Sequence, residues 1–213
     1  MNSKDKKYVA EKAMAALEEL YPDGVCSLEH GGDPYRLLVM AVLSAQCTDA
    51  RVNIVSVPLF EKYKTPDMMA KAPEGELEEA IRSVGLWRSK AKNLRLACKT
   101  LVEDYGGKVP SEMKDLLRLG GVGRKVANLI RGDLYGLGGI VADTHCMRIS
   151  TRLGLSPKAD PLVTEKALEK LIPLEKQSDF CHRIVLFGRD ICTARNPKCA
   201  LCPLKELCGS KAE

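Results

Sequence analysis

The chain has 213 residues, of which 45% are hydrophobic, 5% aromatic and 29% charged, and its formal net charge is +5. This length allows one large domain or two small ones with a real hydrophobic core. The apolar residues fall at helical spacings rather than in short alternating runs, which argues against an all-β fold and predicts a mostly helical one. A charge of +5 permits a polyanionic partner without requiring one.

Neither a membrane span nor a secretion signal is visible in the sequence. No apolar run approaches the roughly 18 residues of a membrane span, and the first residues, MNSKDKKYVAEK, lack the apolar core of a signal peptide. Nine cysteines are many for a cytosolic chain, but an odd number without an export signal argues against a disulfide framework. We therefore expect a cytoplasmic protein with no membrane partner.

Three dipeptides mark helix starts. Asp33-Pro34, Thr65-Pro66 and Asp160-Pro161 each place a capping side chain before a proline that suits the first helical turn. Together with the apolar spacing, these signals predict an all-α chain. The helices are expected near residues 4–20, 34–45, 49–63, 66–72, 74–83, 88–105, 111–118, 123–135, 144–153, 161–171 and 177–190.

One face of the segment 88–105 is apolar, and Gly106 follows the segment as a helix stop. We expect this stripe to belong to the core. Its members are Leu94, Ala97, Cys98 and Leu101. The cysteines outside the C-terminal segment are likewise expected to be small buried hydrophobes. These are Cys26, Cys47, Cys98, Cys146 and Cys181.

A glycine-rich turn at residues 119–125 joins two of the predicted helices. Gly120, Gly121 and Gly123 leave backbone N–H groups accessible at the start of the second helix, where the helix dipole favours an anion. A DNA phosphate is able to dock there without a base-specific contact. An ordinary connection between two helices explains the same glycines, and the turn alone does not decide between the two interpretations.

Lys125 lies in the first turn of the second helix, where acidic residues are usually preferred. The positive end of the helix, partial burial and the neighbouring Arg124 are expected to lower the pKa of this lysine from its free value of about 10.4. A neutral amine attacks carbon and forms Schiff bases. Standing alone, however, a lysine at this place is more typical of a phosphate contact.

A carboxylate follows a short apolar run at residues 140–142. Asp143 stands at the start of the predicted helix 144–153, and we expect it to face one cleft with Lys125. A carboxylate opposite an amine assists proton removal and offsets the positive charge that develops on a sugar as its base departs. Asp143 or Thr144 also suits a helix cap, and both roles can coexist.

Four cysteines are crowded into the last 22 residues with the spacing C-x6-C-x2-C-x5-C. Four soft thiolates that close together predict a metal centre. Tetrahedral zinc and an iron-sulfur cube both fit the ligand type, and the single close doublet favours the cube only weakly. The four ligands are Cys192, Cys199, Cys202 and Cys208.

The loop between the first two of these cysteines carries Arg195 and Lys198. Because both of its ends are pinned by metal ligands, the loop is suited to hold a phosphate. A solvated basic loop is an equally good interpretation of these two cations.

Taken together, residues 119–125, residues 141–145 and the four-cysteine tail resemble the endonuclease III family of helix-hairpin-helix DNA glycosylases. The resemblance extends over about residues 30–208 and includes LSAQCTD at residues 43–49 and VGLWRSKA at residues 84–91. These two segments resemble those with which the family invades the duplex.

The resemblance implies an all-α fold of two domains with double-stranded DNA in the cleft between them. Residues 27–137 would form a six-helix domain with the helix-hairpin-helix, and residues 1–26 and 138–213 an iron-sulfur cluster domain. The implied activity is that of a bifunctional DNA glycosylase and abasic-site lyase acting on oxidised pyrimidines, as a monomer.

The resemblance also implies a role for individual residues. Lys125 would be the Schiff-base nucleophile and Asp143 the catalytic carboxylate, and the four C-terminal cysteines would hold a 4Fe-4S cluster. Gln46 and Leu86 would fill the gap left by the extruded nucleotide. The other expected DNA contacts are Gly121, Gly123, Arg124, His145, Arg148, Arg195 and Lys198.

Two positions depart from the family pattern. Gly120 stands where the hairpin usually has proline, which predicts a less rigid loop and weaker phosphate docking. Leu117 stands where some relatives carry a polar residue near the lesion pocket, so the substrate is not fixed by the resemblance. A glycosylase for mismatched thymine or uracil and a noncatalytic DNA-binding module stapled by a metal are the alternative functions.

Overall fold

The computed structural model describes residues 3–210, and these residues contain helices and loops but no strand. The predicted all-α fold is confirmed. The α-helices are α1 (Ser3–Leu20), α2 (Pro34–Leu43), α3 (Asp49–Lys62), α4 (Pro66–Ala70), α5 (Glu76–Ala80), α6 (Trp87–Tyr105), α7 (Met113–Leu116), α8 (Arg124–Tyr135), α9 (Thr144–Arg152), α10 (Pro161–Glu169) and α11 (Gln177–Asp190). Short 3-10 helices are η1 (Leu174–Lys176), η2 (Cys199–Leu201) and η3 (Lys205–Leu207).

The three predicted helix starts are confirmed by their caps. The side chains of Asp33, Thr65 and Asp160 accept hydrogen bonds from backbone N–H groups in the first turns of α2, α4 and α10. Several predicted helices end a residue or two early, and two are only about half as long as expected. The one expected at 74–83 begins only after Gly75, whose φ of 86° is left-handed, and the one expected at 111–118 is reduced to α7.

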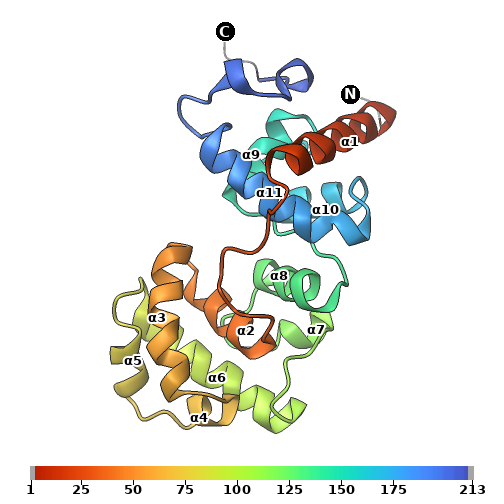
Figure 1. Ribbon diagram of the computed structural model, residues 1–213. Coiled ribbons are helices and arrows are strands. Elements are labelled where there is room, and N and C mark those ends of the chain that lie inside the picture. The colour runs from red at the N-terminus through yellow and green to blue at the C-terminus, as the bar shows by residue number, and fades with distance from the viewer. Residues whose placement is uncertain (1–2, 211–213) are drawn as a thin grey trace. The chain divides into compact units, whose positions relative to one another are not determined.

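The chain divides into two compact units, one of residues 26–135 and one of residues 1–25 with 136–213. In the first, α2 packs against α3, α6 and α8 (Figure 1), and nearly all of its residues are buried. The apolar stripe of α6 is buried as predicted, and Gly106 ends the helix with a φ of 59°. Cys98 is buried, whereas Cys26 and Cys47 are only partly so.

In the second unit α11 packs against α9 and α1, and α9 also contacts α10. Gly188 of α11 lies so close to α9 that an added Cβ would come within 2.5 Å of His145 Nδ1, so only glycine allows this approach. Cys146 and Cys181 are buried here, as predicted.

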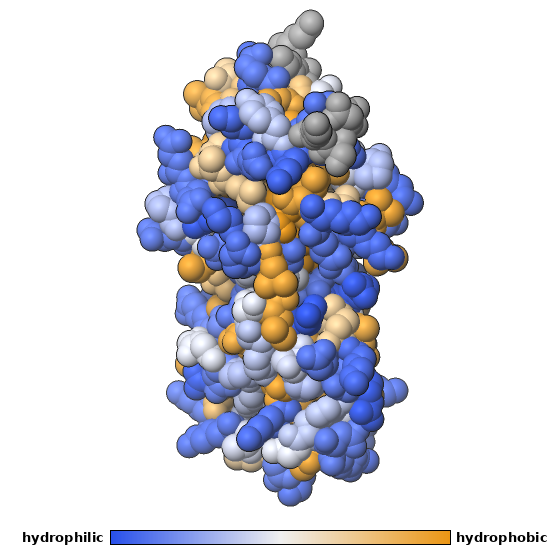
Figure 2. Space-filling model, turned by 90° about the vertical axis from the view of Figure 1, so that its right-hand side faces the viewer, coloured by the Kyte–Doolittle hydropathy of each residue, from blue (hydrophilic) through white to orange (hydrophobic). Residues whose placement is uncertain are grey.

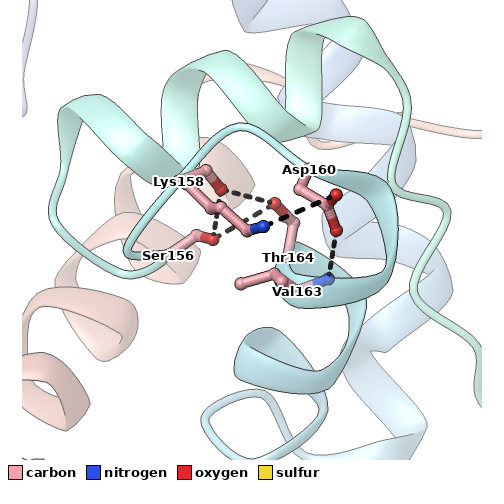
Figure 3. A network of polar contacts seen from close by, with 5 residues as sticks. All are labelled: Ser156, Lys158, Asp160, Val163 and Thr164. Atoms are coloured by element: carbon pink, nitrogen blue, oxygen red, sulfur yellow. Dashed lines mark hydrogen bonds and ion pairs between the residues drawn. The ribbon is translucent and has the colours of Figure 1, made fainter.

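A polar network fixes the loop that leads into α10 (Figure 3). Asp160 accepts a hydrogen bond from Val163 N at 2.9 Å, and the hydroxyls of Ser156 and Thr164 lie 3.2 Å apart. Ser156 also donates to the carbonyl of Lys158. Because Asp160 also pairs with Lys158 Nζ at 3.8 Å, the cap of α10 contacts both the helix and the loop before it.

Hydrophilic side chains cover most of the face seen in Figure 2, with small hydrophobic patches between them. No helix in the part of the chain that the structure describes is both long and apolar enough to cross a membrane.

Candidate active site and cluster site

The glycine-rich turn connects α7 to α8 as a tight hairpin. Val122 N donates to the carbonyl of Leu119 at 3.1 Å, and Gly121 has a φ of 77° that favours glycine. The carbonyl of Gly123 accepts the first hydrogen bond of α8, from Ala127 N at 2.9 Å. The turn therefore presents the N-terminal end of a 12-residue helix.

The structure gives a packing reason for Gly120. A Cβ at this position would lie 2.5 Å from the carbonyl oxygen of Asn93 and 3.1 Å from Leu96 Cβ, both in α6. Because backbone cannot yield as a flexible side chain does, a proline at this position would displace α6 from the hairpin. Gly120 thus lets the hairpin pack directly on α6. From the sequence we had predicted only a less rigid loop at this position.

Gly123, Arg124 and Lys125 are all exposed at the start of α8. The partial burial that we expected for Lys125 is therefore wrong. No heavy atom lies within 4 Å of a Cβ built on Gly123, so the fold itself does not demand glycine there. The open space at Gly123 is compatible with a phosphate approaching the helix.

Asp143 is the N-cap of α9, as predicted. Its Oδ1 accepts a hydrogen bond from Cys146 N at 2.7 Å, and its side chain is partly buried. The apolar run before it is anchored in the core, where Ile140 is fully buried and Val141 N donates to Cys181 Sγ at 3.2 Å. A carboxylate that caps α9 is thereby held at a fixed place in its unit.

His145 and Arg148 pack against α11. Arg148 Nη2 donates to the carbonyls of Gly188 and Cys192 at 3.1 and 2.8 Å and lies 3.2 Å from His145 Nδ1. Burial lowers the pKa of His145, and the charges of Arg148 and Arg189 lower it further against the opposing effect of Asp143. Both side chains hold α9 to α11, a role that the sequence did not predict. Their contact with DNA stays a prediction.

Gln46 and Leu86 share an unusual backbone conformation. Their φ angles are 54° and 58°, and among residues 3–210 Asn196 is the one other non-glycine residue with positive φ. Residues other than glycine rarely adopt this left-handed backbone conformation, and residues strained in this way are enriched at functional sites. Leu86 is also 57% exposed, although leucine is normally buried.

The four C-terminal cysteines line one cavity, together with apolar side chains and three cations. The 3-10 helix η2 brings Cys199 next to Cys202, and Arg152 Nη1 donates to Cys192 Sγ at 3.2 Å. Burial raises the pKa of the Cys202 thiol, and the other three thiols add to the rise. Four thiols this close oppose one another's ionisation, because each thiolate would repel the next. A bound metal centre offsets that negative charge and allows all four to bind as thiolates. The cations are Arg152, Lys198 and Lys205.

Arg195 and Lys198 lie in the loop between the first two cluster cysteines. Both are exposed, and Lys198 Nζ pairs with Asp190 Oδ1 at 3.0 Å. Arg152 donates to the carbonyls of Thr193 and Ala194, which fixes the first half of the loop. The sequence did not reveal this role of Arg152, since the carbonyls that it binds lie 41 and 42 residues later in the chain.

Comparison with known proteins identifies the family. Residues 39–174 match the model of the HhH-GPD superfamily base excision DNA repair proteins, and residues 192–208 match that of the iron-sulfur binding domain of endonuclease III. An endonuclease III of Synechocystis sp. is 44% identical over 206 residues, which cover 96% of this chain and 94% of the relative. The chain belongs to the endonuclease III family.

Two further comparisons agree with this membership. An endonuclease III of Bacillus subtilis is 42% identical, with 98% of this chain and 93% of the relative covered. A solved structure of a trapped endonuclease III-DNA covalent intermediate matches with a TM-score of 0.91 and 43% identity, covering 98% of this chain and 97% of the other. As a family member, the chain is a base excision repair enzyme of the DNA glycosylase and abasic-site lyase class.

The cofactor of this endonuclease III family member is a 4Fe-4S cluster. The four thiols and the surrounding cations fit it, because a cube held by thiolates carries net negative charge. Replacing Cys202 with serine is expected to lower the iron content from about four atoms per chain and to remove the visible absorption. Iron analysis and an absorption spectrum of the purified protein check this.

Cys26→Ser is the matched control for the cluster, because Cys26 is a thiol that does not line the cavity. It should leave both iron and colour unchanged. Colourless wild-type protein with one zinc per chain would contradict the assignment.

Proposed function

We propose that this chain excises oxidised pyrimidines from double-stranded DNA and then nicks the strand, with Lys125 as nucleophile and Asp143 as catalytic carboxylate. The observation that carries the proposal is the match, over nearly the whole chain, to an endonuclease III that was solved as a trapped covalent intermediate with DNA. Lys125 lies exposed in the first turn of α8, next to the glycine hairpin, where a bound DNA strand can reach its amine.

The proposed reaction proceeds in two stages. The amine nitrogen of Lys125 forms a bond to C1′ while the C1′–N bond breaks, and the departing base takes the bonding electron pair and a proton. The C1′–O4′ bond then breaks, the ring oxygen takes that electron pair and the proton lost from the nitrogen, and an imine forms between Lys125 and C1′. Removal of a C2′ proton then expels the 3′ phosphate by β-elimination, and water releases the lysine. Asp143 serves as the group that accepts a proton and balances the developing positive charge.

The proposed DNA contacts fall into two groups. Gln46 and Leu86 would enter the duplex, and their left-handed backbones and the exposure of Leu86 support this. The other DNA contacts would come from the hairpin, from α9 and from the basic loop. They are Gly121, Gly123, Arg124, His145, Arg148, Arg195 and Lys198. Arg148 would contact DNA either while its bonds to the carbonyls of Gly188 and Cys192 are kept or after DNA replaces them.

We also propose how the chain is organised and where it acts. Residues 27–137 would be the six-helix domain, and residues 1–26 with 138–213 the iron-sulfur cluster domain. The enzyme would act as a monomer in the cytoplasm. Four thiols in one cavity next to the fixed loop 193–198 support a bracing role of the cluster for that loop.

A panel of duplexes that differ in a single base tests the proposal. Thymine glycol and an abasic site should give strand nicks and, with borohydride, a covalent protein-DNA adduct. Thymine or uracil opposite guanine should react far more slowly. Leu117, 41% exposed at the end of α7, makes the panel necessary because it departs from the family pattern. Preferential excision of mismatched thymine would replace the proposed substrate class, and binding without any adduct would leave a noncatalytic module.

A further inference from the structure

Lys90 is the one lysine that is buried among the residues the structure describes, with 3% of its surface exposed. Its Nζ donates a hydrogen bond to the carbonyl oxygen of Leu43 at 2.8 Å. Burial lowers the pKa of Lys90, and Cys47 opposes this shift. Burying an ammonium is costly unless it is hydrogen-bonded, so the bond to Leu43 is what stabilises Lys90 at this buried place.

The bond from Lys90 joins two helix ends. Leu43 is the last residue of α2, whose final carbonyls have no partner within the helix, and Lys90 lies in the first turn of α6. A cation at the C-terminal end of a helix also interacts favourably with the helix dipole. The contact therefore fixes the end of α2 relative to the start of α6.

Gln46 and Leu86, the wedge residues proposed to enter the duplex, lie on either side of this bond. The turn at residues 44–47 follows α2 and carries Gln46, with Cys47 N donating to the carbonyl of Ser44 at 3.1 Å. Leu86 directly precedes α6, and its carbonyl accepts a hydrogen bond from Lys90 N at 3.0 Å. A Cβ at Gly85 would lie 3.3 Å from the carbonyl oxygen of Gln46, so the two turns touch.

The catalytic hairpin approaches the same helix end. A Cβ at Gly121 would lie 3.2 Å from Val42 Cγ1, one residue before Leu43. The turn of Gln46 and the hairpin thus meet the last turn of α2, and the turn of Leu86 touches the turn of Gln46. The Lys90 bond is the charged contact at their meeting point.

We propose that Lys90 is a positioning residue for duplex invasion, whose bond to Leu43 holds the turns of Gln46 and Leu86 together in the conformations that enter the DNA. The inference rests on the proposed function, because that function assigns Gln46 and Leu86 as the side chains that fill the gap. Without the Lys90 bond, a turn that relaxes would have to regain its left-handed backbone during binding. Loss of this bond should therefore weaken entry into the duplex rather than formation of the covalent bond to C1′.

The variant Lys90→Met tests this, since methionine keeps much of the aliphatic stem but cannot donate a hydrogen bond. On duplex DNA with an abasic site, the single-turnover rate of adduct formation should fall about 10-fold, the loss expected for one hydrogen bond from a charged donor. On a single-stranded abasic oligonucleotide there is no partner strand to invade, and the rate should match that of wild type. A general structural defect would lower both rates.

Fluorescence gives a readout that does not depend on catalysis. A duplex carries 2-aminopurine opposite a tetrahydrofuran abasic analogue, which the enzyme binds but cannot open. Wild type should raise the fluorescence as the wedge side chains disturb the stack, and Lys90→Met should reduce this rise. Lys92→Met is the matched control, because it removes the same charge from an exposed place in α6.

Two checks keep the test decisive. The melting temperature of Lys90→Met should stay within about 5 °C of wild type, since one hydrogen bond is exchanged for the burial of an apolar group. If it falls further, Lys90→Gln gives a second measurement: because its amide still donates an N–H, it should restore the duplex rate and the fluorescence rise toward wild type, whereas a loss as large as that of Lys90→Met would overturn the role of the bond. In the Leu86→Ala background, Lys90→Met should cause little additional loss, because the two changes impair the same step.

The outcomes separate this inference from the proposed function. Equal losses on duplex and single strand, or no loss on either, would overturn the positioning role. If wild type forms no adduct on any substrate, the proposed function fails, but the rise in 2-aminopurine fluorescence on binding still tests the role of Lys90. The same rise in Lys90→Met as in wild type would then contradict the positioning role of the Lys90 bond.

Discussion

Lys125→Gln is expected to abolish borohydride trapping on abasic DNA and to lower the rates of base excision and strand nicking by about 10³-fold or more, which corresponds to a loss of about 4 kcal/mol of transition-state stabilisation. A glutamine amide has no basic lone pair, so it cannot form the imine on which β-elimination depends. Single-turnover excision from a thymine glycol duplex and gel analysis of the trapped adduct measure both effects.

Folding should be unaffected by this change. Lys125 is exposed, and a surface substitution of this kind alters stability by no more than about 0.5 kcal/mol. Removing a cation from the first turn of α8 also relieves an unfavourable interaction with the helix dipole. Lys114→Gln, at an exposed position of α7, is the control for general loss of charge and should trap DNA normally. An adduct that survives in Lys125→Gln would disprove the nucleophile.

Asp143→Asn is expected to lower the single-turnover rate by about 10² to 10⁴-fold, the range for a positioned general acid or base. The charge is lost, but the cap is not, because asparagine caps helices as well as aspartate does and still offers an oxygen to Cys146 N. The melting temperature should therefore stay close to that of wild type. Rates and thermal unfolding of the same preparations give the comparison.

A second substitution separates the two roles of Asp143. Asp143→Ala loses the cap as well as the charge, so it should add a stability loss of about 1 kcal/mol to the loss of rate. Asp160→Asn is the matched control, since Asp160 caps α10 in the same unit through a 2.9 Å bond from Val163 N. It should leave the rate unchanged. Full activity in Asp143→Asn would mean that Asp143 serves only as a cap.

The local parts of the fold could be predicted because their signals lie within a few residues. Asp33, Thr65 and Asp160 cap their helices through N–H groups two or three residues away, and Gly106 ends α6 at its own φ. The four cysteines are close in sequence, so their meeting in one cavity followed from spacing alone. The family could be named for the same reason, from short motifs.

Long-range contacts were not predictable in this way. Gly120 looked like a loosened hairpin, yet it allows the backbone of α6, some 27 residues earlier, to approach within contact distance. Arg148 looked like a DNA contact, yet its Nη2 donates to carbonyls 40 and 44 residues away. Lysine at position 90 carried no signal of burial, because nothing near it in sequence reveals the carbonyl of Leu43.

The sequence by itself determined the all-α composition, the cap of each marked helix, the glycine hairpin before Lys125 and the metal-binding cysteines. It could do so because capping, turn formation and closely spaced ligands depend on local backbone geometry. Only the tertiary structure decided that Gln46 and Leu86 are held with left-handed backbones, and that a buried ammonium joins their turns. Strain of this kind persists only where packed neighbours enforce it, and those neighbours are brought together by the fold.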